Sequence, residues 1–176
     1  MKIKFLVAIG VVLCIGIAAM LLVRDPVKIE PFALPDGTIY AIDAVPFEMP
    51  TDANVDEKLA AFWKQAEQAY REERYTHSAA AMKEVVALDF RSVDAAYYHG
   101  SALLLGGDAD TASAELERAL FFAEESGYPT DGIEWMYAQA LVAMQDGETA
   151  RGVLEGIISS KTAYADRAKS LLSHLQ

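Results

Sequence analysis

An internal repeat constrains the fold of this 176-residue chain more than any other feature. Residues of matching size recur 34 positions apart, and recur again 38 positions later. The small members of the series are Ala66, Gly100 and Ala138, and the large members are Met82, Leu116 and Leu154. A sequence period between about 20 and 50 residues indicates supersecondary units that stack to share one continuous core. The four extra residues fall around 126–131, in a predicted loop, where added length costs little free energy.

Apolar residues follow the period of an α-helix from about residue 56 to the C-terminus. Gly106 and Gly127 suit helix ends, because glycine readily adopts the left-handed conformation. Asp108 and Thr130 suit the starts of the helices that follow them. The predicted helices span residues 56–74, 75–88, 93–105, 111–125, 131–145, 148–160 and 163–175. Seven short helices with short connections predict an all-α antiparallel array.

The segment GSALLLGGDADTASAELERAL, residues 100–120, resembles the tetratricopeptide repeat. In that family a small residue on the first helix of each repeat faces a large residue on the second, here Gly100 and Leu116. The resemblance implies an α-solenoid domain over residues 52–176. Its three helix-turn-helix repeats would span about 58–91, 92–129 and 130–160, with a capping helix at 161–176.

The resemblance also implies a binding surface, because the first helix of each repeat lines a concave groove in that family. The groove positions that carry over are Trp63, Glu67, Tyr70, Tyr97, Ser101, Leu104, Trp135, Gln139 and Val142. Aromatic rings with a few polar groups favour an extended peptide or a helix of a partner protein. Trp63 and Glu67 stand where the family places a Lys and an Asn that bind acidic tails, so an acidic partner is not expected. Some of the rings can instead belong to the core between repeats or be covered by the linker.

Residues 5–23, FLVAIGVVLCIGIAAMLLV, contain no Asp, Glu, Lys, Arg or His. At about 1.5 Å per residue, a helix of this length spans roughly 28 Å, close to the hydrocarbon core of a bilayer. Lys2 and Lys4 precede it, so the positive-inside rule predicts a cytoplasmic N-terminus and an exported domain. We predict a transmembrane anchor at residues 1–24. A cleaved signal peptide, whose apolar region is usually shorter, is the alternative.

Residues 25–51 hold five of the six prolines and therefore cannot form a long helix. Pro35-Asp36-Gly37 is a turn signal, because proline presets φ and glycine permits a positive φ. It separates two stretches that are compatible with a short hairpin. Two interpretations of this linker stay open. It is a spacer that holds the domain off the membrane, or it docks on the domain or pairs with a partner strand.

The sequence contains 15 Lys and Arg against 26 Asp and Glu, a net charge of −11. A nucleic-acid partner is not expected, because binding to phosphates needs a basic surface. Residues 51–176 alone carry −10, which favours basic or apolar protein partners and repels anionic lipid. His77, His99 and His174 lie on different predicted helices without metal-ligand spacing, and Cys14 is the only cysteine. No metal or other cofactor is therefore expected.

We expect no enzyme activity, because the sequence contains no phosphate-binding loop, nucleophile elbow or H-E-x-x-H motif. The expected function is a protein-interaction scaffold that recruits an envelope protein or complex. Its expected location is a bacterial inner membrane, crossed once, with the repeat domain in the periplasm. The alternatives are a component of a transmembrane signalling or anti-sigma-type system, a self-assembling protein, and a secreted soluble adaptor.

Overall fold

The helices lie where the apolar periodicity predicts them in the computed structural model, which describes residues 32–48 and 56–175. Within these ranges they are α2 (Glu57–Arg71), α3 (Tyr75–Leu88), α4 (Val93–Leu105), α5 (Ala109–Ser126), α6 (Asp131–Ala143), α7 (Gly147–Ser160) and α8 (Ala165–Ser173). Every helix end lies within three residues of its predicted position. The all-α prediction is confirmed for this part of the chain.

Short polar side chains begin four of the helices. Asp56, Ser92, Asp108 and Asp146 accept hydrogen bonds from backbone N–H groups in the first turns of α2, α4, α5 and α7. Each bond satisfies a donor that the helix itself leaves without a partner. Thr130 precedes α6, but its hydroxyl bonds the Glu134 side chain and caps no backbone N–H.

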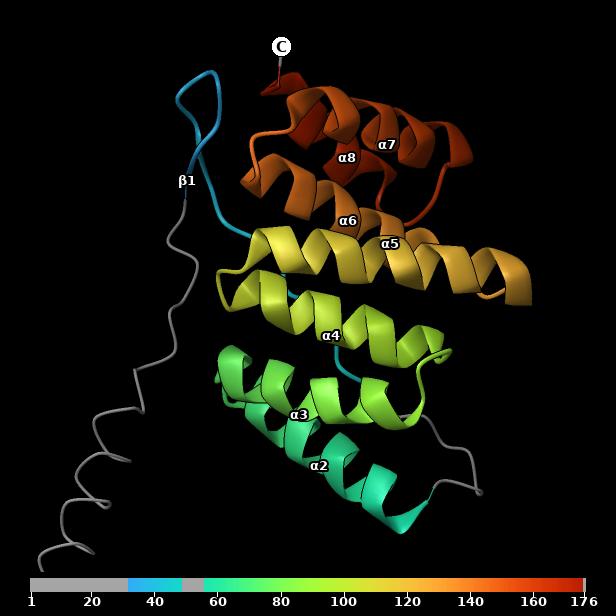
Figure 1. The fold of residues 1–176 in the computed structure, drawn as a ribbon. Coiled ribbons are helices and arrows are strands. Elements are labelled where there is room, and N and C mark those ends of the chain that lie inside the picture. The colour runs from blue at the N-terminus through green and yellow to red at the C-terminus, as the bar shows by residue number, and fades with distance from the viewer. Residues whose placement is uncertain (1–31, 49–55, 176) are drawn as a thin grey trace, which may run out of the picture.

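Each helix packs on the helices that precede and follow it in the chain, and Figure 1 shows α2 to α7 stacked in chain order, with α8 behind α7. Three buried apolar clusters follow one another along this stack. The first joins α2, α3 and α4, the second joins α4, α5 and α6, and the third joins α6, α7 and α8. Each helix pair therefore buries its apolar side chains against the next pair.

The close approach of α4 and α5 depends on Gly100. A Cβ atom on Gly100 would lie 2.7 Å from Cγ of Leu116 and 3.2 Å from the carbonyl oxygen of Ala112. At the corresponding place 34 residues earlier, the Ser78 hydroxyl donates a hydrogen bond of 2.9 Å to the carbonyl oxygen of Ala66. Small residues at these two places let the paired helices cross at short range.

Residues 32–48, called here the N-terminal segment, begin with a hairpin of β1 (Phe32–Ala33) and β2 (Ile39–Tyr40). The strands are antiparallel, with Phe32 opposite Tyr40. The turn lies at the Pro-Asp-Gly signal, where Gly37 has a φ of 84° and its N–H donates to the carbonyl oxygen of Leu34 at 2.8 Å.

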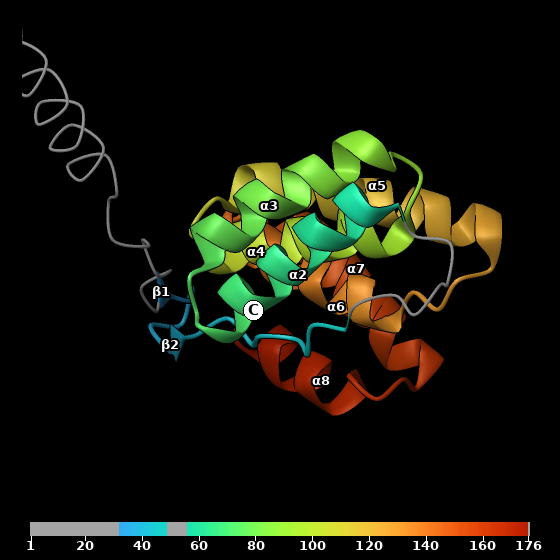
Figure 2. The ribbon, with the colours of Figure 1, turned by 90° about the horizontal axis from the view of Figure 1, so that it is seen from below.

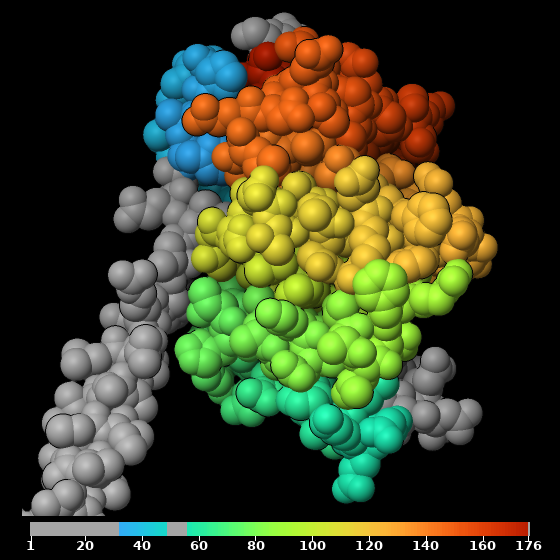
Figure 3. Space-filling model, viewed as in Figure 1, coloured from blue at the N-terminus to red at the C-terminus, as the bar shows by residue number. Residues whose placement is uncertain are grey.

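The N-terminal segment packs along the whole stack of helices. Leu34, Val45 and Phe47 are buried, and each joins a different one of the three apolar clusters. The hairpin lies against the C-terminal helices in Figure 3, and Figure 2 shows the following residues passing beside α2. Residues 32–48 therefore dock on the helices and do not form a free spacer.

Among the described residues, no helix combines the length and the apolar character needed to cross a bilayer. The predicted anchor at residues 5–23 lies outside the described ranges.

Candidate functional site

The surface formed by α2, α4 and α6, called here the α2–α4–α6 face, binds the backbone of the N-terminal segment through Gln139. The Oε1 atom of Gln139 accepts hydrogen bonds from the Asp43 N–H at 2.7 Å and from the Tyr40 hydroxyl at 2.9 Å. Its Nε2 atom donates to the Asp43 carbonyl oxygen at 3.4 Å and to the Met136 sulfur at 3.3 Å. The side chain is fully buried, so these bonds are not shared with bulk water. A carboxamide that pairs with both polar groups of one residue's backbone binds the segment independently of its side chains.

Phe47 of the segment lies in a cage of three rings, called here the aromatic cage: Trp63 and Tyr70 from α2, and Tyr98 from α4. The ring centroids lie 5.9, 5.2 and 4.3 Å from that of Phe47, in that order, with Tyr98 stacked on it. The Tyr98 hydroxyl also accepts a hydrogen bond of 3.0 Å from the backbone N–H of Glu48. Aromatic pairs of this geometry contribute about 0.5–1.5 kcal/mol each beyond the area they bury.

The predicted groove residues divide into two groups in the structure. Trp63, Tyr70 and Gln139 contact the N-terminal segment, as the aromatic and hydrogen-bond contacts above describe. Tyr97 packs on the same two apolar clusters as Ile42 of the segment. These four residues from three helices are therefore brought together along one face, and that face is covered by the protein's own N-terminal segment.

The remaining predicted residues lie at packing positions. Ser101, Leu104 and Val142 are buried, and the Ser101 hydroxyl bonds the backbone of its own helix at Tyr97. Trp135 is 1 % exposed and stacks on Tyr164 at a centroid distance of 5.7 Å. Glu67 pairs with Arg71 one turn along α2 at 2.7 Å. Ser101, Leu104 and Trp135 thus have the positions of core residues between neighbouring helices.

Tyr98 belongs to the face although the repeat alignment does not select it. The alignment places Tyr97 there, because Tyr97 lies 34 residues after Trp63. Adjacent residues of a helix point about 100° apart, so Tyr97 and Tyr98 contact the N-terminal segment from different directions. Their ring centroids are 5.0 Å apart, with Tyr98 on Phe47 and Tyr97 beside it. The sequence feature that could have indicated this arrangement is the pair of successive tyrosines, Tyr97 and Tyr98.

Burial disfavours ionisation of the tyrosine hydroxyls of this face. It raises the pKa of Tyr40, Tyr70 and Tyr98 above the usual value. For Tyr98, the carboxylates of Asp94 and Glu48 raise the pKa further, although the Glu48 N–H acts in the opposite direction. The hydroxyls therefore act as uncharged donors and acceptors at neutral pH.

Replacing Gln139 with alanine is expected to lower the free energy of unfolding by about 2 kcal/mol, because it leaves the polar groups of Asp43 without their partner. Urea denaturation followed by circular dichroism measures the change. The matched control is Gln68→Ala on α2, whose side chain bonds only the exposed Glu72, and we expect a change below about 0.5 kcal/mol there. Equal effects of the two substitutions would contradict the role given to Gln139.

The hairpin is attached to the C-terminal end of α8 by a contact between the side chains of His174 and Asp36. His174 Nδ1 lies 2.6 Å from Asp36 Oδ2 and 3.3 Å from the Thr38 hydroxyl. The hydrogen bond from His174, together with that from the Thr38 N–H, lowers the pKa of Asp36 from 3.8 to about 2. Because the folded pKa is the lower one, this contribution to stability is present above about pH 4 and is lost as the pH falls toward 2.

Replacing His174 with alanine is expected to raise the pKa of Asp36 toward 3.8, since the largest cause of its low value is removed. Carboxyl chemical shifts of Asp36, followed by NMR from about pH 6 to about pH 1.5, measure this pKa in both proteins. An Asp36 pKa that is the same with and without His174 would rule out the hydrogen bond between the two side chains.

A second polar cluster lies outside the α2–α4–α6 face. Glu115 Oε2 lies 3.4 Å from His99 Nδ1 and 2.5 Å from the Arg118 guanidinium. Burial raises the pKa of Glu115, but the nearby His99 side chain and the Arg118 guanidinium outweigh it, so its pKa is below the usual value. The cluster joins α4 to α5, and Glu115 is thus a partly buried partner and not a fully solvated side chain.

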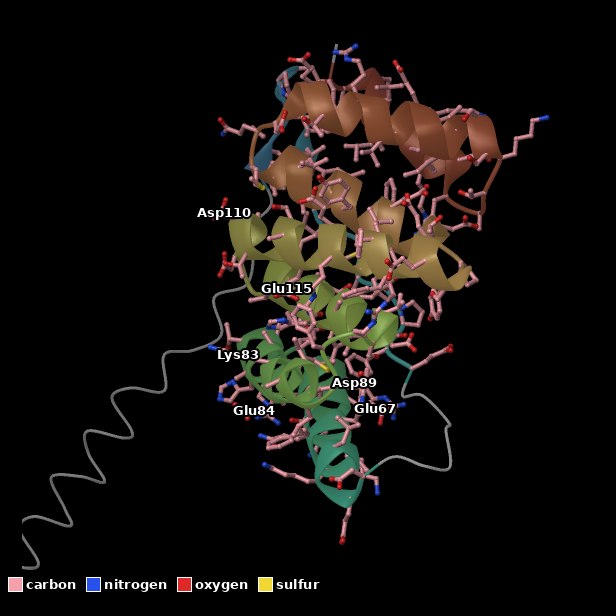
Figure 4. The ribbon with its side chains drawn as sticks, turned by 45° about the vertical axis from the view of Figure 1, so that its right-hand side comes forward. Glu67, Lys83, Glu84, Asp89, Asp110 and Glu115 are labelled. Atoms are coloured by element: carbon pink, nitrogen blue, oxygen red, sulfur yellow. The ribbon has the colours of Figure 1, made fainter. Side chains whose placement is uncertain are left out.

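Charged side chains are otherwise spread over the outer surface of the stack. Figure 4 labels examples on three helices, namely Glu67, Lys83, Glu84 and Asp110, and they do not converge on one point. Within the described ranges, no group of three or more His, Cys, Asp or Glu side chains is arranged to hold a metal ion. The α2–α4–α6 face is therefore the site with the most specific geometry.

No protein-family model matches the sequence, and no curated protein matches it either.

Proposed function

We propose that this protein is a membrane-tethered interaction scaffold whose α2–α4–α6 face binds an extended segment of a protein partner. Residues 5–23 would serve as the anchor in a bacterial inner membrane, and the helical domain would lie in the periplasm. The protein would recruit an envelope protein or complex and would catalyse no reaction.

The helical domain supports this proposal through its repeated packing. The small–large pair of Gly100 and Leu116, the corresponding position of Ala66, and the stacking of helix pairs in chain order agree with tetratricopeptide-like repeats. Arrays of this kind present the first helix of each repeat on one continuous surface, and such surfaces are suited to extended ligands.

One observation carries the proposal: an extended segment already lies across this face. Gln139 and Tyr98 hold its backbone, at the polar groups of Asp43 and at the Glu48 N–H. Both are side-chain contacts to main-chain groups, which any peptide can make. A partner segment with a matching apolar pattern can therefore make the same bonds.

The proposal is tested by affinity capture from native membranes with full-length protein that carries Phe47→Ala, which weakens the docking of the resident segment, and with the same protein carrying Gln139→Ala in addition. A specific partner should be captured at least about tenfold less well by the double variant, since its backbone contact with Gln139 is lost. The captured protein is then purified and its direct binding is measured by calorimetry.

Gln68→Ala is the matched control, because it removes the same side chain from an exposed position of α2. Added to Phe47→Ala, it should capture the partner as well as Phe47→Ala alone does. Circular dichroism confirms that each variant is helical. Partner binding that is indifferent to Gln139 would reject this face as the binding surface.

A further inference from the structure

We propose that a pocket between α3, α4 and the start of α5 is a separate binding site, and that it takes a free α-amino acid with an aliphatic side chain. None of the residues that hold the N-terminal segment line this pocket, so the proposal goes beyond the function proposed above. The pocket has a volume of about 260 Å³, which suits a small molecule rather than a protein segment.

Small residues make room for the pocket. Its apolar lining includes Ala79 and Ala80 of α3, together with Ala102 of α4 and Gly106 at the end of that helix. Gly106 stands close to α3, since a Cβ atom on it would lie 3.4 Å from the Cγ2 atom of Thr76. Walls of this kind bury a short aliphatic side chain and offer it no polar partner.

The next repeat carries larger side chains at two of the corresponding places. The residues 38 positions after Gly106 and His99, which both line the pocket, are Met144 and Tyr137. The turns that follow correspond as well, because Gly107 and Gln145 both have a positive φ. The space at α3 and α4 is therefore not a general consequence of stacking two repeats. It depends on the small residue at position 106 and the shorter ring at position 99.

The charges at the pocket also differ from those of the next repeat. Lys83, which lines the pocket, corresponds to Glu117 at 34 residues later, whereas Asp108 and Asp146 are acidic in both repeats. Burial and the carboxylates of Glu117 and Asp146 raise the pKa of Tyr137, so two carboxylates lie near one ring there. The pocket instead combines one ammonium group with one carboxylate.

A zwitterion matches these two charges. The Lys83 ammonium can bind a carboxylate, and within the described ranges it has no ion pair with another side chain. The Asp108 carboxylate caps α5 through Oδ1, which accepts from the Thr111 N–H at 3.1 Å, and its second oxygen can accept from an ammonium group. An α-amino acid carries both charges on one carbon atom and leaves its side chain for the apolar walls.

His99 adds a buried polar group to the pocket. Its side chain is 9 % exposed, and its Nδ1 atom lies 3.4 Å from Glu115 Oε2, without the alignment of a hydrogen bond. The nearby carboxylate favours a proton on Nδ1, which leaves Nε2 as an acceptor. A ligand ammonium group can therefore donate to His99 as well as to Asp108.

The test titrates the full-length protein in detergent micelles with L-alanine, L-valine and L-leucine. NMR follows the imidazole signals of His99 and the methyl signals of Ala79 and Ala102. The amino acid that binds most tightly is then compared with two analogues of the same side chain that each lack one charge. For leucine these are isocaproate, which has no ammonium group, and isoamylamine, which has no carboxylate.

At least one of the three amino acids should give saturable shifts at these signals, with a Kd of about 1 mM or lower. Each analogue should bind at least about tenfold more weakly, because it lacks one of the two charged contacts. The proposal is overturned if no amino acid gives a saturable shift at about 20 mM. It is also overturned if an analogue binds as tightly as the amino acid.

Two substitutions remove the charges of the pocket one at a time. Lys83→Gln and Asp108→Asn should each weaken binding by at least about fivefold, and the asparagine still caps α5. The matched controls are Lys64→Gln at an exposed position of α2 and Asp146→Asn at the corresponding cap of α7. Each control should change the Kd by less than about twofold. Circular dichroism confirms that all four variants are helical, and a Kd that neither pocket substitution changes would overturn the proposal.

Discussion

Replacement of Phe47 with alanine lowers the free energy of unfolding by about 3 kcal/mol on the present structure. The ring is 7 % exposed and contacts three aromatic side chains, so its removal forfeits both its apolar burial and its ring contacts. The loss stays near the lower end of the range for core phenylalanines. Residues 42–48 can detach once the ring is gone, so the loss cannot exceed the free energy with which the segment docks.

Two measurements separate this local effect from general damage to the fold. Urea denaturation gives the change in stability, and amide hydrogen exchange should show faster exchange in residues 42–48 and at the cage. The matched control is Phe121→Ala, because the Phe121 side chain is 57 % exposed on α5 and its loss should cost less than about 1 kcal/mol. A Phe47→Ala protein as stable as the control would show that the segment contributes little to the domain.

The helical part of the fold could be predicted from the sequence because its determinants are local. Apolar periodicity, short capping side chains and glycine at helix ends act over a few residues, and every helix end lies within three positions of its prediction. The small residue at position 100 predicted a close helix crossing, and the distance from its expected Cβ to Leu116 agrees with it.

The docking of residues 32–48 could not be predicted in the same way. The prolines exclude a long helix, but they do not distinguish a free spacer from an extended segment that packs on a surface. Docking depends on contacts such as the one between Asp43 and Gln139, which are 96 residues apart in the sequence. The linker sequence has no periodicity from which the surface that buries Val45 and Phe47 could be predicted.

The candidate site was predicted only in part for a related reason. The repeat alignment names positions on three helices but does not show which of them the rest of the chain covers. Trp135 is instead covered by Tyr164, which lies beyond the last repeat, and the Trp63 ring is covered by Phe47, which lies before the first repeat. Which side chains of a repeat face outward thus depends on the segments at both ends of the domain.

Replacement of Gly100 with valine is expected to lower the free energy of unfolding by about 3 kcal/mol. The new Cβ atom would lie 2.7 Å from Leu116 Cγ, and Leu116 is fully buried, so neither side chain has room to move aside. The gain in helix propensity over glycine is only a few tenths of a kcal/mol and cannot offset this. Gly152→Val on α7 is the control, because no atom lies within 4 Å of the expected Cβ. Its stability in urea should change by less than about 0.5 kcal/mol.

The cause of the Gly100→Val effect is isolated by adding Leu116→Ala. Alone, Leu116→Ala should cost about 3 kcal/mol, because it leaves a cavity in the buried contact between α4 and α5. In the double variant the valine methyl groups occupy part of that cavity, so the combined loss should fall below the sum of the two by at least about 1 kcal/mol. Strict additivity would mean that Gly100 acts through its backbone and not through contact with Leu116. Non-additivity would show that one small–large pair sets the distance between α4 and α5, and α4 carries Tyr98 of the aromatic cage.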